Sequence, residues 1–435
     1  MPTPSSAQRA RIAVVGSGVS GLTAAYLLAR RHDVVLYESL SRAGGHAHTH
    51  SVAPGPTAPD CDPIAVDSGF IVHNHRTYPF LLKLFAELGV ATQPTEMSMS
   101  ISVPQTGLEY AGGRGLGGVL AQRRRVLDRR FLAMLRQVGR FQREARALVR
   151  DPSAGPDQES LADFLTRGGY SQDFLQWYAL PVVACVWSSG AATALEYPAR
   201  YLFTFLEHHG MLTQKGSPRW YTVVGGSKVY VDAVLASLPD VRLGSPVTAV
   251  RRLPADADGG SGAEVRAGGG PYERYDAVVL ATHADEALRL LEDPTPAEQD
   301  VLRAFRYSTN ETVLHRDDSL LPRAVGARAS WNYRLGERDE PVTVTYWMNR
   351  LQHLPEHTPL LVTLGGAPEV AADQVVARMT YRHPIYDARS VAAQARLPEL
   401  TTPTTTYAGA YHGWGFHEDG CRSGVAAAAA LGVSW

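Results

Sequence analysis

The sequence predicts an α/β fold in which a Rossmann-like nucleotide-binding unit is combined with a cap made of an antiparallel sheet and helices. Three observations lead to this prediction. A strand, a glycine-rich turn, a helix and a second strand follow one another in residues 12–38. Strand character returns in residues 241–283, and a strand, a loop and a helix follow in residues 405–432. Between these parts, alternating and helical patterns predict the sheet and the helices of the cap.

The turn after the first strand has the spacing of a dinucleotide-binding loop. Gly16, Gly18 and Gly21 form a GxGxxG pattern between a β-branched run and an Ala/Leu-rich helical run. The first glycine permits a tight turn, the second lets the backbone approach a pyrophosphate, and the third lets the helix pack closely on the strand. Free N–H groups at the helix N-terminus then face the phosphates, and we expect Ser17 and Ser20 to contact them too.

An acidic residue completes the nucleotide unit. Glu38 ends the second strand about twenty residues after the first glycine, where a carboxylate can accept hydrogen bonds from a ribose diol. Ser39, the next residue, belongs to the same expected site. Strand, turn, helix and acid together favour a dinucleotide site over a βαβ unit whose glycines only make a turn.

The later elements predict a nucleotide domain that is built from separate parts of the chain. Strands are predicted in residues 64–72, 97–112, 241–283, 330–336 and 342–349, and helices in residues 77–90 and through most of residues 118–235. The expected nucleotide domain comprises residues 11–77, 218–290 and 400–435, the expected cap comprises residues 78–217 and 291–399, and residues 1–10 are expected to be a disordered tail.

Composition excludes several classes of function. The chain has 435 residues, 45% of them hydrophobic, and a formal net charge of -1, so nothing points to nucleic acid. No run reaches the roughly 18 apolar residues of a membrane span, and the N-terminus lacks the apolar segment of a secretory signal. We therefore expect a cytoplasmic protein, possible contact with a membrane surface being left open. No metal is expected, because the cysteines are far apart and no acidic cluster accompanies the histidines: Cys61, Cys185 and Cys421.

One segment departs from this neutral balance. Residues 121–150 form a helical pattern dense in arginine. The functional interpretation is a docking face for an acidic carrier protein, an anionic lipid or an acidic substrate. The interpretation that we favour is a solvated helix face. Its expected buried stripe consists of Val126, Phe131, Leu132, Leu135, Val138 and Phe141.

Two further motifs concern the class of dinucleotide, and they favour a flavin. After the second strand, Arg42, Gly44 and Gly45 match an RxGG motif, and near the C-terminus Glu418 precedes a Ser-Gly pair at residues 423–424. With these motifs the sequence resembles the flavin-containing amine oxidase superfamily, which includes monoamine oxidases and phytoene desaturases. The resemblance covers nearly the whole chain and implies an amine-oxidase-like fold with FAD as the cofactor.

The same resemblance implies further contacts with the cofactor. It places the C-terminal acid and its neighbour under the pyrimidine edge of the flavin, and a strand backbone beside the adenine. The residues that it adds to the expected FAD site are Arg42, Gly44, Gly45, His46, Val247, Gly409, His417 and Glu418.

Longer stretches suggest a subfamily. The segments GGHAHTHSV and GFHEDGCRSG look like those of a bacterial flavoprotein subfamily, similar to the flavoprotein region fused to plant cyclopropane fatty acid synthases. This resemblance implies a fatty-acyl or other apolar substrate, with a lipid-modifying methyltransferase or an acyl carrier as candidate partner. His46 stands where amine oxidases usually have arginine, and the paired C-terminal aromatics of an amine cage are absent.

Catalysis by a flavin oxidoreductase requires hydride transfer and often a base for the second proton, for which histidine is a common choice. The candidates are His46, His48 and His417, together with Tyr346 and Asn349 on a predicted cap strand. The alternatives are that the imidazoles only bind the cofactor and that the strand residues only pack.

We therefore expect an FAD-dependent oxidoreductase that transfers hydride from a substrate carbon to flavin N5, as a desaturase, dehydrogenase or isomerase. The alternative enzyme is an amine or amino-acid oxidase. The alternative without catalysis is a flavin-binding partner subunit of a lipid-modifying methyltransferase.

Overall fold

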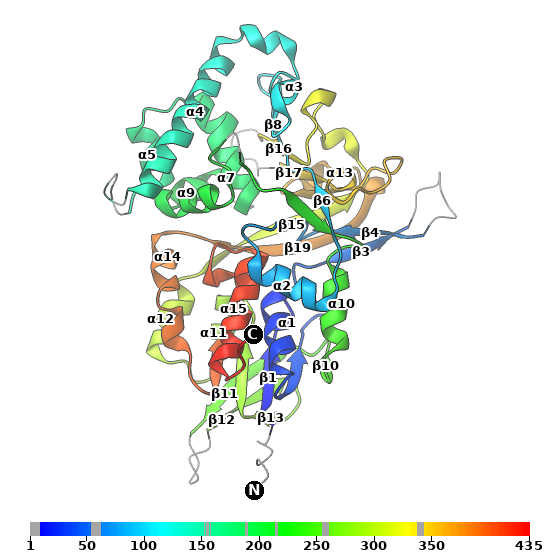
Figure 1. The fold of residues 1–435 in the computed structure, drawn as a ribbon, viewed down its shortest axis with the longest axis vertical. Coiled ribbons are helices and arrows are strands. Elements are labelled where there is room, and N and C mark those ends of the chain that lie inside the picture. Colours follow the sequence, from blue (N-terminus) through cyan, green and yellow to red (C-terminus); the bar gives the residue numbers. More distant parts are fainter. Residues whose placement is uncertain are drawn as a thin grey trace.

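Two parts of the molecule lie one above the other along its long axis (Figure 1). This computed structural model describes residues 9–53, 62–151, 153, 156, 158–187, 190–213, 216–254, 261–336 and 343–435. Cys61 and the first eight residues of the predicted disordered tail lie outside the described residues.

The lower part is built on a parallel sheet of five strands. In spatial order these are β10 (Asp240–Arg242), β2 (Asp33–Tyr37), β1 (Arg11–Val15), β14 (Ala277–Leu280) and β20 (Thr405–Tyr407). All four pairings are parallel, and β1 and β14 are almost entirely buried, as expected of apolar strands covered on both faces.

Helices cover one face of this sheet and a mixed layer covers the other (Figure 1). The first layer consists of α1 (Val19–Leu28), α2 (Pro79–Leu88), α10 (Lys228–Ala236) and α15 (His417–Ala430). The second consists of β11 (Val247–Leu253), β12 (Gly262–Ala267), β13 (Tyr272–Tyr275), α11 (Ala284–Leu290), α12 (Pro296–Arg303) and α14 (Ala388–Gln394). The α/β fold and its nucleotide-binding unit are thus confirmed.

Three helices within the stretches predicted for the cap pack on the lower part. Leu81 of α2, Val301 of α12 and Ala393 of α14 are buried in the cores around the parallel sheet. The predicted boundaries assign α2, α12 and α14 to the cap, whereas these helices pack on the lower part. The reason is that an apolar pattern alone does not tell which core a helix joins.

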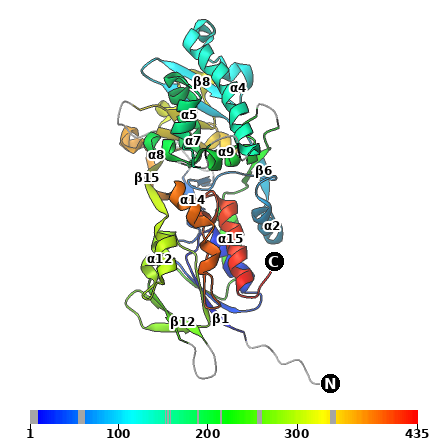
Figure 2. The same ribbon diagram turned by 90° about the vertical axis from the view of Figure 1, so that its left-hand side faces the viewer.

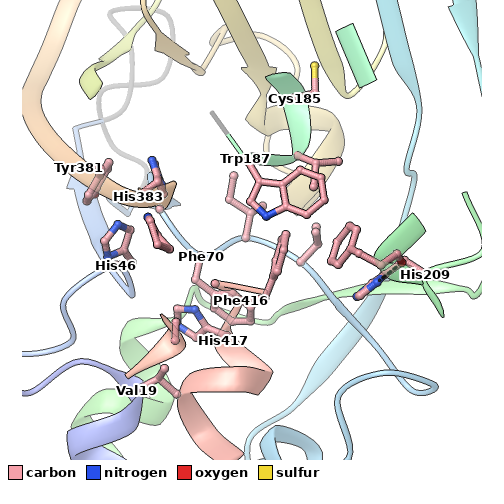
Figure 3. A pocket seen from close by; sticks show the side chains of 18 of the residues that line it. Val19, His46, Phe70, Cys185, Trp187, His209, Tyr381, His383, Phe416 and His417 are labelled. Carbon is pink, nitrogen blue, oxygen red and sulfur yellow. Dashed lines mark hydrogen bonds between the residues drawn. The ribbon is translucent and has the colours of Figure 1, made fainter. Parts of the chain in front are cut away.

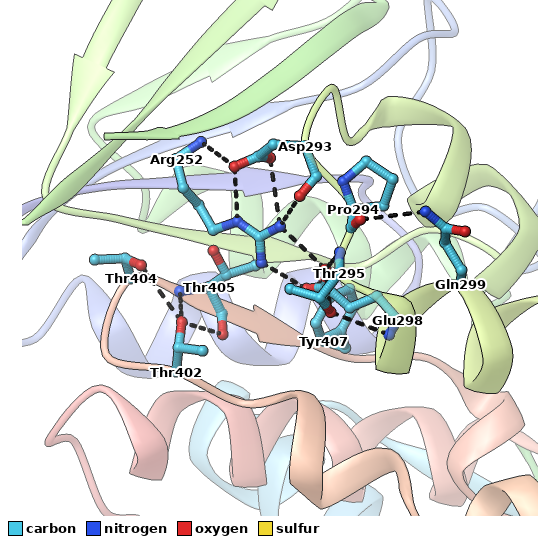
Figure 4. Close-up of polar contacts among 10 residues, drawn as sticks. All are labelled: Arg252, Asp293, Pro294, Thr295, Glu298, Gln299, Thr402, Thr404, Thr405 and Tyr407. Atoms are coloured by element: carbon cyan, nitrogen blue, oxygen red, sulfur yellow. Dashed lines mark hydrogen bonds and ion pairs between the residues drawn. The ribbon is translucent and has the colours of Figure 1, made fainter. Parts of the chain in front are cut away.

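A buried polar network shows why α12 stays with the nucleotide part (Figure 4). Glu298 on α12 is 2% exposed, and its Oε1 accepts hydrogen bonds from Arg252 Nη1 of β11 at 2.7 Å and from Tyr407 Oη of β20 at 2.5 Å. Arg252 also pairs with Asp293 at 3.2 Å. A buried carboxylate needs such partners, and here they come from two strands of the lower part.

The upper part is a cap with a seven-stranded sheet. In spatial order its strands are β19 (Val375–Ile385), β15 (Arg306–His315), β18 (Leu361–Leu364), β17 (Thr343–Trp347), β16 (Trp331–Arg334), β7 (Met99–Val103) and β8 (Leu108–Gly112). All neighbours are antiparallel except β16 and β7.

Helices complete the cap, and short strands connect it to the lower part. The helices are α3 (Gly115–Val119), α4 (Arg129–Arg150), α5 (Leu161–Arg167), α6 (Gln172–Phe174), α7 (Leu180–Trp187), α8 (Ala191–Glu196), α9 (Ala199–His208) and α13 (Met348–Gln352). The connecting strands are β3 (Thr49–Val52), β4 (Ile64–Asp67), β5 (His73–Asn74), β6 (Thr92–Thr95) and β9 (Trp220–Val223).

Two local predictions are wrong. The strand predicted over residues 342–349 ends at Trp347, and Asn349 lies in α13. Val126 does not join the buried stripe of α4: it lies in a 3-10 turn, η1 (Arg123–Leu127), and is 47% exposed. The helix begins only at Arg129, because Asp128 caps it by accepting the N–H groups of the first turn.

Candidate active site

A cavity of about 1420 Å³ runs from the glycine-rich turn of the lower part into the cap. Figure 3 shows its middle, where His46, Tyr381 and His383 gather on one side, and Trp187 and Cys185 lie toward the cap. The cavity therefore joins the predicted nucleotide site to the interior of the cap.

The glycines of the turn differ in what surrounds them. A Cβ on Gly16 would lie 2.6 Å from the carbonyl oxygen of Ala281, and one on Gly21 would lie 1.9 Å from the carbonyl oxygen of Gly16. A Cβ on Gly18 would meet no protein atom within 4 Å. The first and third glycines thus allow close packing of the chain on itself, whereas the second leaves space at the N-terminus of α1, where a pyrophosphate fits.

Glu38 is held at the end of β2, beside this space. Its Oε2 accepts hydrogen bonds from the backbone N of Ser17 at 3.1 Å and from its hydroxyl at 2.5 Å. Its Oε1 accepts from the backbone N of Leu40 at 2.9 Å. The carboxylate lines the cavity while fixing the turn that carries the glycines.

Most of the predicted FAD-binding residues line this one cavity. They are Gly16, Ser17, Gly18, Ser20, Glu38, Ser39, Gly45, His46, Val247, Gly409 and His417. The residues that do not line it are Gly21, Arg42, Gly44 and Glu418. Arg42 supports the loop from behind, because its Nη1 donates to the carbonyl oxygen of Gly45 at 2.9 Å. The N–H of Gly44 likewise donates to the carbonyl oxygen of Ser17 at 3.0 Å.

His46 lies where the cap sheet meets the nucleotide part. Its ring centroid is 5.0 Å from that of Tyr381 and 5.2 Å from that of His383, both on β19. Burial, with the nearby His283 and Arg42, lowers the pKa of His46 to about 4, so its imidazole is neutral at pH 7. Among the described atoms, its buried Nε2 has no hydrogen-bond partner. It can therefore exchange a hydrogen bond or a proton with a ligand.

His48 does not line the cavity. Its Nδ1 forms a hydrogen bond of 3.0 Å with the hydroxyl of Tyr381, and its ring lies 4.0 Å from that of His50. Burial lowers the pKa of His48 to about 3. His48 thus supports Tyr381, which itself lines the cavity.

His417 is the first residue of α15 and lies on the cavity wall. Its ring stacks on Phe70 at a centroid distance of 3.8 Å, and its Nε2 shares a hydrogen bond of 3.2 Å with the hydroxyl of Tyr230. Burial lowers the pKa of His417 well below its usual value, so the ring is a neutral group at a helix N-terminus.

Glu418 is engaged away from the cavity. Its two carboxylate oxygens accept hydrogen bonds from the backbone N of Phe80 at 3.1 Å and of Leu81 at 3.0 Å, in the first turn of α2. Burial raises its pKa to about 7. In this structure Glu418 ties α15 to α2, and its contact with a flavin stays a prediction.

The two candidates on the cap sheet have different surroundings. Tyr346 lines the cavity, and its ring packs edge-to-face on Trp331 at 5.3 Å. Asn349 holds a loop: its Nδ2 donates to the carbonyl oxygens of Pro355 and Thr358, and its Oδ1 accepts from the N of Leu360 at 2.7 Å. Asn349 does not line the cavity.

The cap end of the cavity contains residues that the sequence analysis did not assign to the site. Tyr178 lines it from the π-helical turn before α7, Val182 and Cys185 line it from α7, and Leu135 and Val138 line it from α4. Tyr178, Val182 and Cys185 are four and three residues apart, and this helical spacing was the signal in the sequence that they share one face.

His383 was also missed. It lines the cavity beside His46, and its alternation with Tyr381 along β19 was the available signal. Within the described residues, no group of three or more His, Cys, Asp or Glu side chains is placed to hold a metal ion.

The chain resembles known proteins in both sequence and fold. The family model described as flavin containing amine oxidoreductase matches residues 19–315. No curated protein sequence matches the chain.

Several solved structures share the fold over nearly the full length of both chains. A double mutant of putrescine oxidase has 15% identity and a TM-score of 0.67, over 97% of this chain and 99% of that one. Cyclohexylamine oxidase from Brevibacterium oxydans IH-35A has 16% identity and a TM-score of 0.66, over 97% and 98%. A CLA-producing fatty acid isomerase from P. acnes has 15% identity and a TM-score of 0.66, also over 97% and 98%. At this identity the likeness shows the fold.

Proposed function

Because the chain belongs to the flavin containing amine oxidoreductase family and is an FAD-dependent oxidoreductase, we propose that it removes hydride from a carbon atom of a fatty-acyl or other apolar substrate. The observation that carries this proposal is the apolar cap end of the cavity. FAD, when bound, supplies the acceptor for the hydride at its N5 atom.

The nucleotide end of the cavity fits FAD. Gly18 and the N-terminus of α1 offer open space and free N–H groups for the pyrophosphate, and Glu38 offers a fixed carboxylate for the ribose. Val247 and His417 line the same cavity and are assigned to the adenine and to the pyrimidine edge of the flavin. In this proposal the flavin ring faces the cap.

The cap end suits a hydrocarbon chain. Its walls include Leu135, Val138, Val182, Val186 and Leu364. Each methylene that such a wall removes from water contributes about 0.8 kcal/mol. Among the described cap residues that line the cavity, none carries a carboxylate that could pair with an ammonium group. This lining favours an acyl or other apolar substrate over a cationic amine.

We assign His46 to proton transfer. It is neutral, buried and unpaired at Nε2 among the described atoms, and it lies at the junction of the two ends of the cavity. An imidazole in this state can accept the proton that a substrate loses together with hydride. Tyr381 and His383 pack around the ring and hold its position.

The substrate class can be tested by anaerobic titration of the purified holoprotein with ligands that share a tail and differ in the head group. We expect dodecanoic acid or its thioester to remove the visible absorbance of the oxidised flavin, and dodecylamine and putrescine to leave it. Reduction by both amines and by no acyl compound would instead establish an amine oxidase. A flavin reduced by none of the four, with the acyl compounds recovered unchanged, would favour a non-catalytic partner subunit.

A variant can test the cavity itself. Val182→Trp should fill the cap end and lower kcat/KM for a 16-carbon acyl substrate by about tenfold, with little change for an 8-carbon substrate. Val229→Trp, at a side chain that is 40% exposed on α10, is the matched control. Equal losses for both chain lengths would place the acyl chain elsewhere. The methyltransferase or acyl carrier partner and the cytoplasmic location stay predictions.

A further inference from the structure

The cavity reaches the surface of the cap beside α3. Leu116 lines the cavity and is 78% exposed, and Gly113, which also lines it, is exposed. Other parts of the cavity wall come from β6 and β9, where Thr95 pairs with Trp220 and both residues line the cavity. A ligand that enters here passes over Leu116.

Apolar side chains are unusually exposed around this mouth. The three most exposed of the large apolar side chains described are Leu127 at 86%, Leu116 at 78% and Val325 at 73%, and Val126 is 47% exposed. They lie on α3, η1 and a 3-10 turn, η4 (Val325–Ala327). η4 adjoins the short segment between α3 and η1, since a Cβ on Gly326 would lie 3.3 Å from the Cβ of Ala121.

This region is the end of the cap that lies farthest from the nucleotide part. Figure 1 places α3 and the start of α4 in the upper part of the molecule, on the far side of the cap sheet from α1 and β1, and Figure 2 likewise shows α4 and β8 at the end of the molecule opposite β1. We call it the tip surface, consisting of Leu116, Val126, Leu127 and Val325 with the exposed arginines Arg123, Arg124, Arg129 and Arg323.

The tip surface carries uncompensated positive charge. Within the described chain, none of its four arginines forms an ion pair with a carboxylate. The nearby acids are already engaged: Asp128 caps α4 and pairs with Arg125 at 2.7 Å, and Glu109 accepts the backbone N–H groups of Arg323 and Ala324. An anionic partner therefore finds free guanidinium groups around protruding apolar side chains.

We propose that the tip surface docks on an anionic lipid bilayer, with the cavity mouth at the lipid. Arginines together with exposed leucine and valine side chains are typical of segments that lie in a membrane interface. Exposed apolar patches also occur at protein–protein interfaces, so an acidic carrier protein is the other occupant that the experiment below distinguishes from a bilayer. Within the described residues no helix is long and apolar enough to cross a bilayer, so the contact proposed is peripheral.

The use of this contact rests on the proposed function. An acyl chain that leaves a bilayer through the mouth would pass from lipid into the apolar end of the cavity without crossing water. Binding to the bilayer itself needs no turnover, so the two proposals can fail separately.

Sedimentation of the holoprotein with lipid vesicles tests the proposal. The probes are vesicles of phosphatidylcholine alone and vesicles in which a third of the lipid is phosphatidylglycerol. We expect sedimentation with the anionic vesicles, loss of it at high salt, and weak binding to phosphatidylcholine. Arg123→Glu/Arg124→Glu should weaken binding about tenfold or more, and Leu116→Ser/Leu127→Ser should weaken it in low salt as well.

Control variants carry changes of the same kind elsewhere. Arg303→Glu/Arg389→Glu alters two exposed arginines of the lower part, and Leu243→Ser alters a leucine there that is 40% exposed. These variants should sediment like the unaltered protein. The proposal is overturned if the unaltered protein stays in solution, or if tip and control variants bind alike. Capture by immobilised acyl carrier protein without vesicle binding would replace the bilayer with a protein partner. Reduction by dispersed acyl substrates is measured separately, so its failure would count against the proposed function alone.

Discussion

Gly18 and Gly21 belong to one motif but meet different surroundings. A Cβ on Gly18 points into open space, and its φ of -63° suits any residue. We expect Gly18→Ala to leave the free energy of unfolding of the FAD-free protein unchanged, while FAD binding weakens about tenfold or more because the methyl group occupies space for the pyrophosphate. Chemical denaturation and FAD titration of the apoprotein measure the two effects.

Gly21→Ala is the matched variant for this prediction. Its Cβ would lie 1.9 Å from a backbone oxygen, so the helix must move and the free energy of unfolding should fall by about 1–3 kcal/mol even without FAD. If Gly18→Ala were the unstable variant of the two, the open space at α1 would not be the pyrophosphate site.

Glu38 both shapes the loop and is assigned to the ribose. Glu38→Ala removes a carboxylate that accepts hydrogen bonds from the backbone N of Ser17 and of Leu40. Each charge-assisted bond contributes about 1.5–3 kcal/mol, so the variant should be purified with little FAD. The flavin-to-protein absorbance ratio measures this, and Glu311→Ala, at an exposed cap residue, should keep normal occupancy. Full occupancy in Glu38→Ala would refute the assignment.

The contact between α15 and α2 gives a pH dependence at the scale of elements. Burial raises the pKa of Glu418 from 4.5 to about 7. The folded state then holds this proton more tightly than the unfolded state, so the stability contributed by the neutral form is lost as the pH rises from 4.5 to 7.

Glu418→Gln should remove this dependence. The free energy of unfolding of the unaltered protein, minus that of the variant, should fall by about 3 kcal/mol between pH 4.5 and 7.5. Urea denaturation across this range measures the difference. A difference that stays constant with pH would mean that the hydrogen bonds from Phe80 and Leu81 outweigh burial.

Elements with a strong local signal were predictable from the sequence. The helix predicted over residues 77–90 is found as α2, with Pro79 in its first turn and Gly89 as a left-handed cap at φ 67°. Val126 was misplaced because a cap by Asp128 decided where α4 begins. Asn349 was misplaced because its side chain bonds to the loop that follows α13 instead of extending the strand. The histidines around His46 come together only through the packing of the cap sheet, which spacing along the chain does not reveal.

At the scale of the molecule, a cluster of histidines joins the two parts. His383 of the cap sheet lies beside His46 of the nucleotide part, and burial with the neighbouring His46 and His283 lowers its pKa to about 3. His383 binds a proton less readily in the folded state than in the unfolded state. Stability that is present above pH 6.5 is therefore lost as the pH falls below 6.5. The adjacent Arg382 is paired with Asp285 at 2.7 Å.

His383→Gln should therefore protect the molecule against acid. The free energy of unfolding of the unaltered holoprotein, relative to the variant, should fall by about 3 kcal/mol from pH 6.5 to pH 4. His357→Gln, in a loop of the cap where the ring is exposed, is the control. Equal acid sensitivity of all three proteins would show that the cluster does not limit stability.

The close contact of α1 with α15 has a consequence for biosynthesis. A Cβ on Gly424 would lie 2.3 Å from the carbonyl oxygen of Ser20, so the two helices meet almost backbone to backbone. On the ribosome, α1 leaves the exit tunnel early, yet its packing partner is translated only from His417 onward. A nascent chain with a complete GxGxxG motif thus exposes the face of α1 that packs on α15 until α15 has been translated, and this is the kind of surface that chaperones protect. Flavin loading is accordingly expected as a late event, after α15 has emerged.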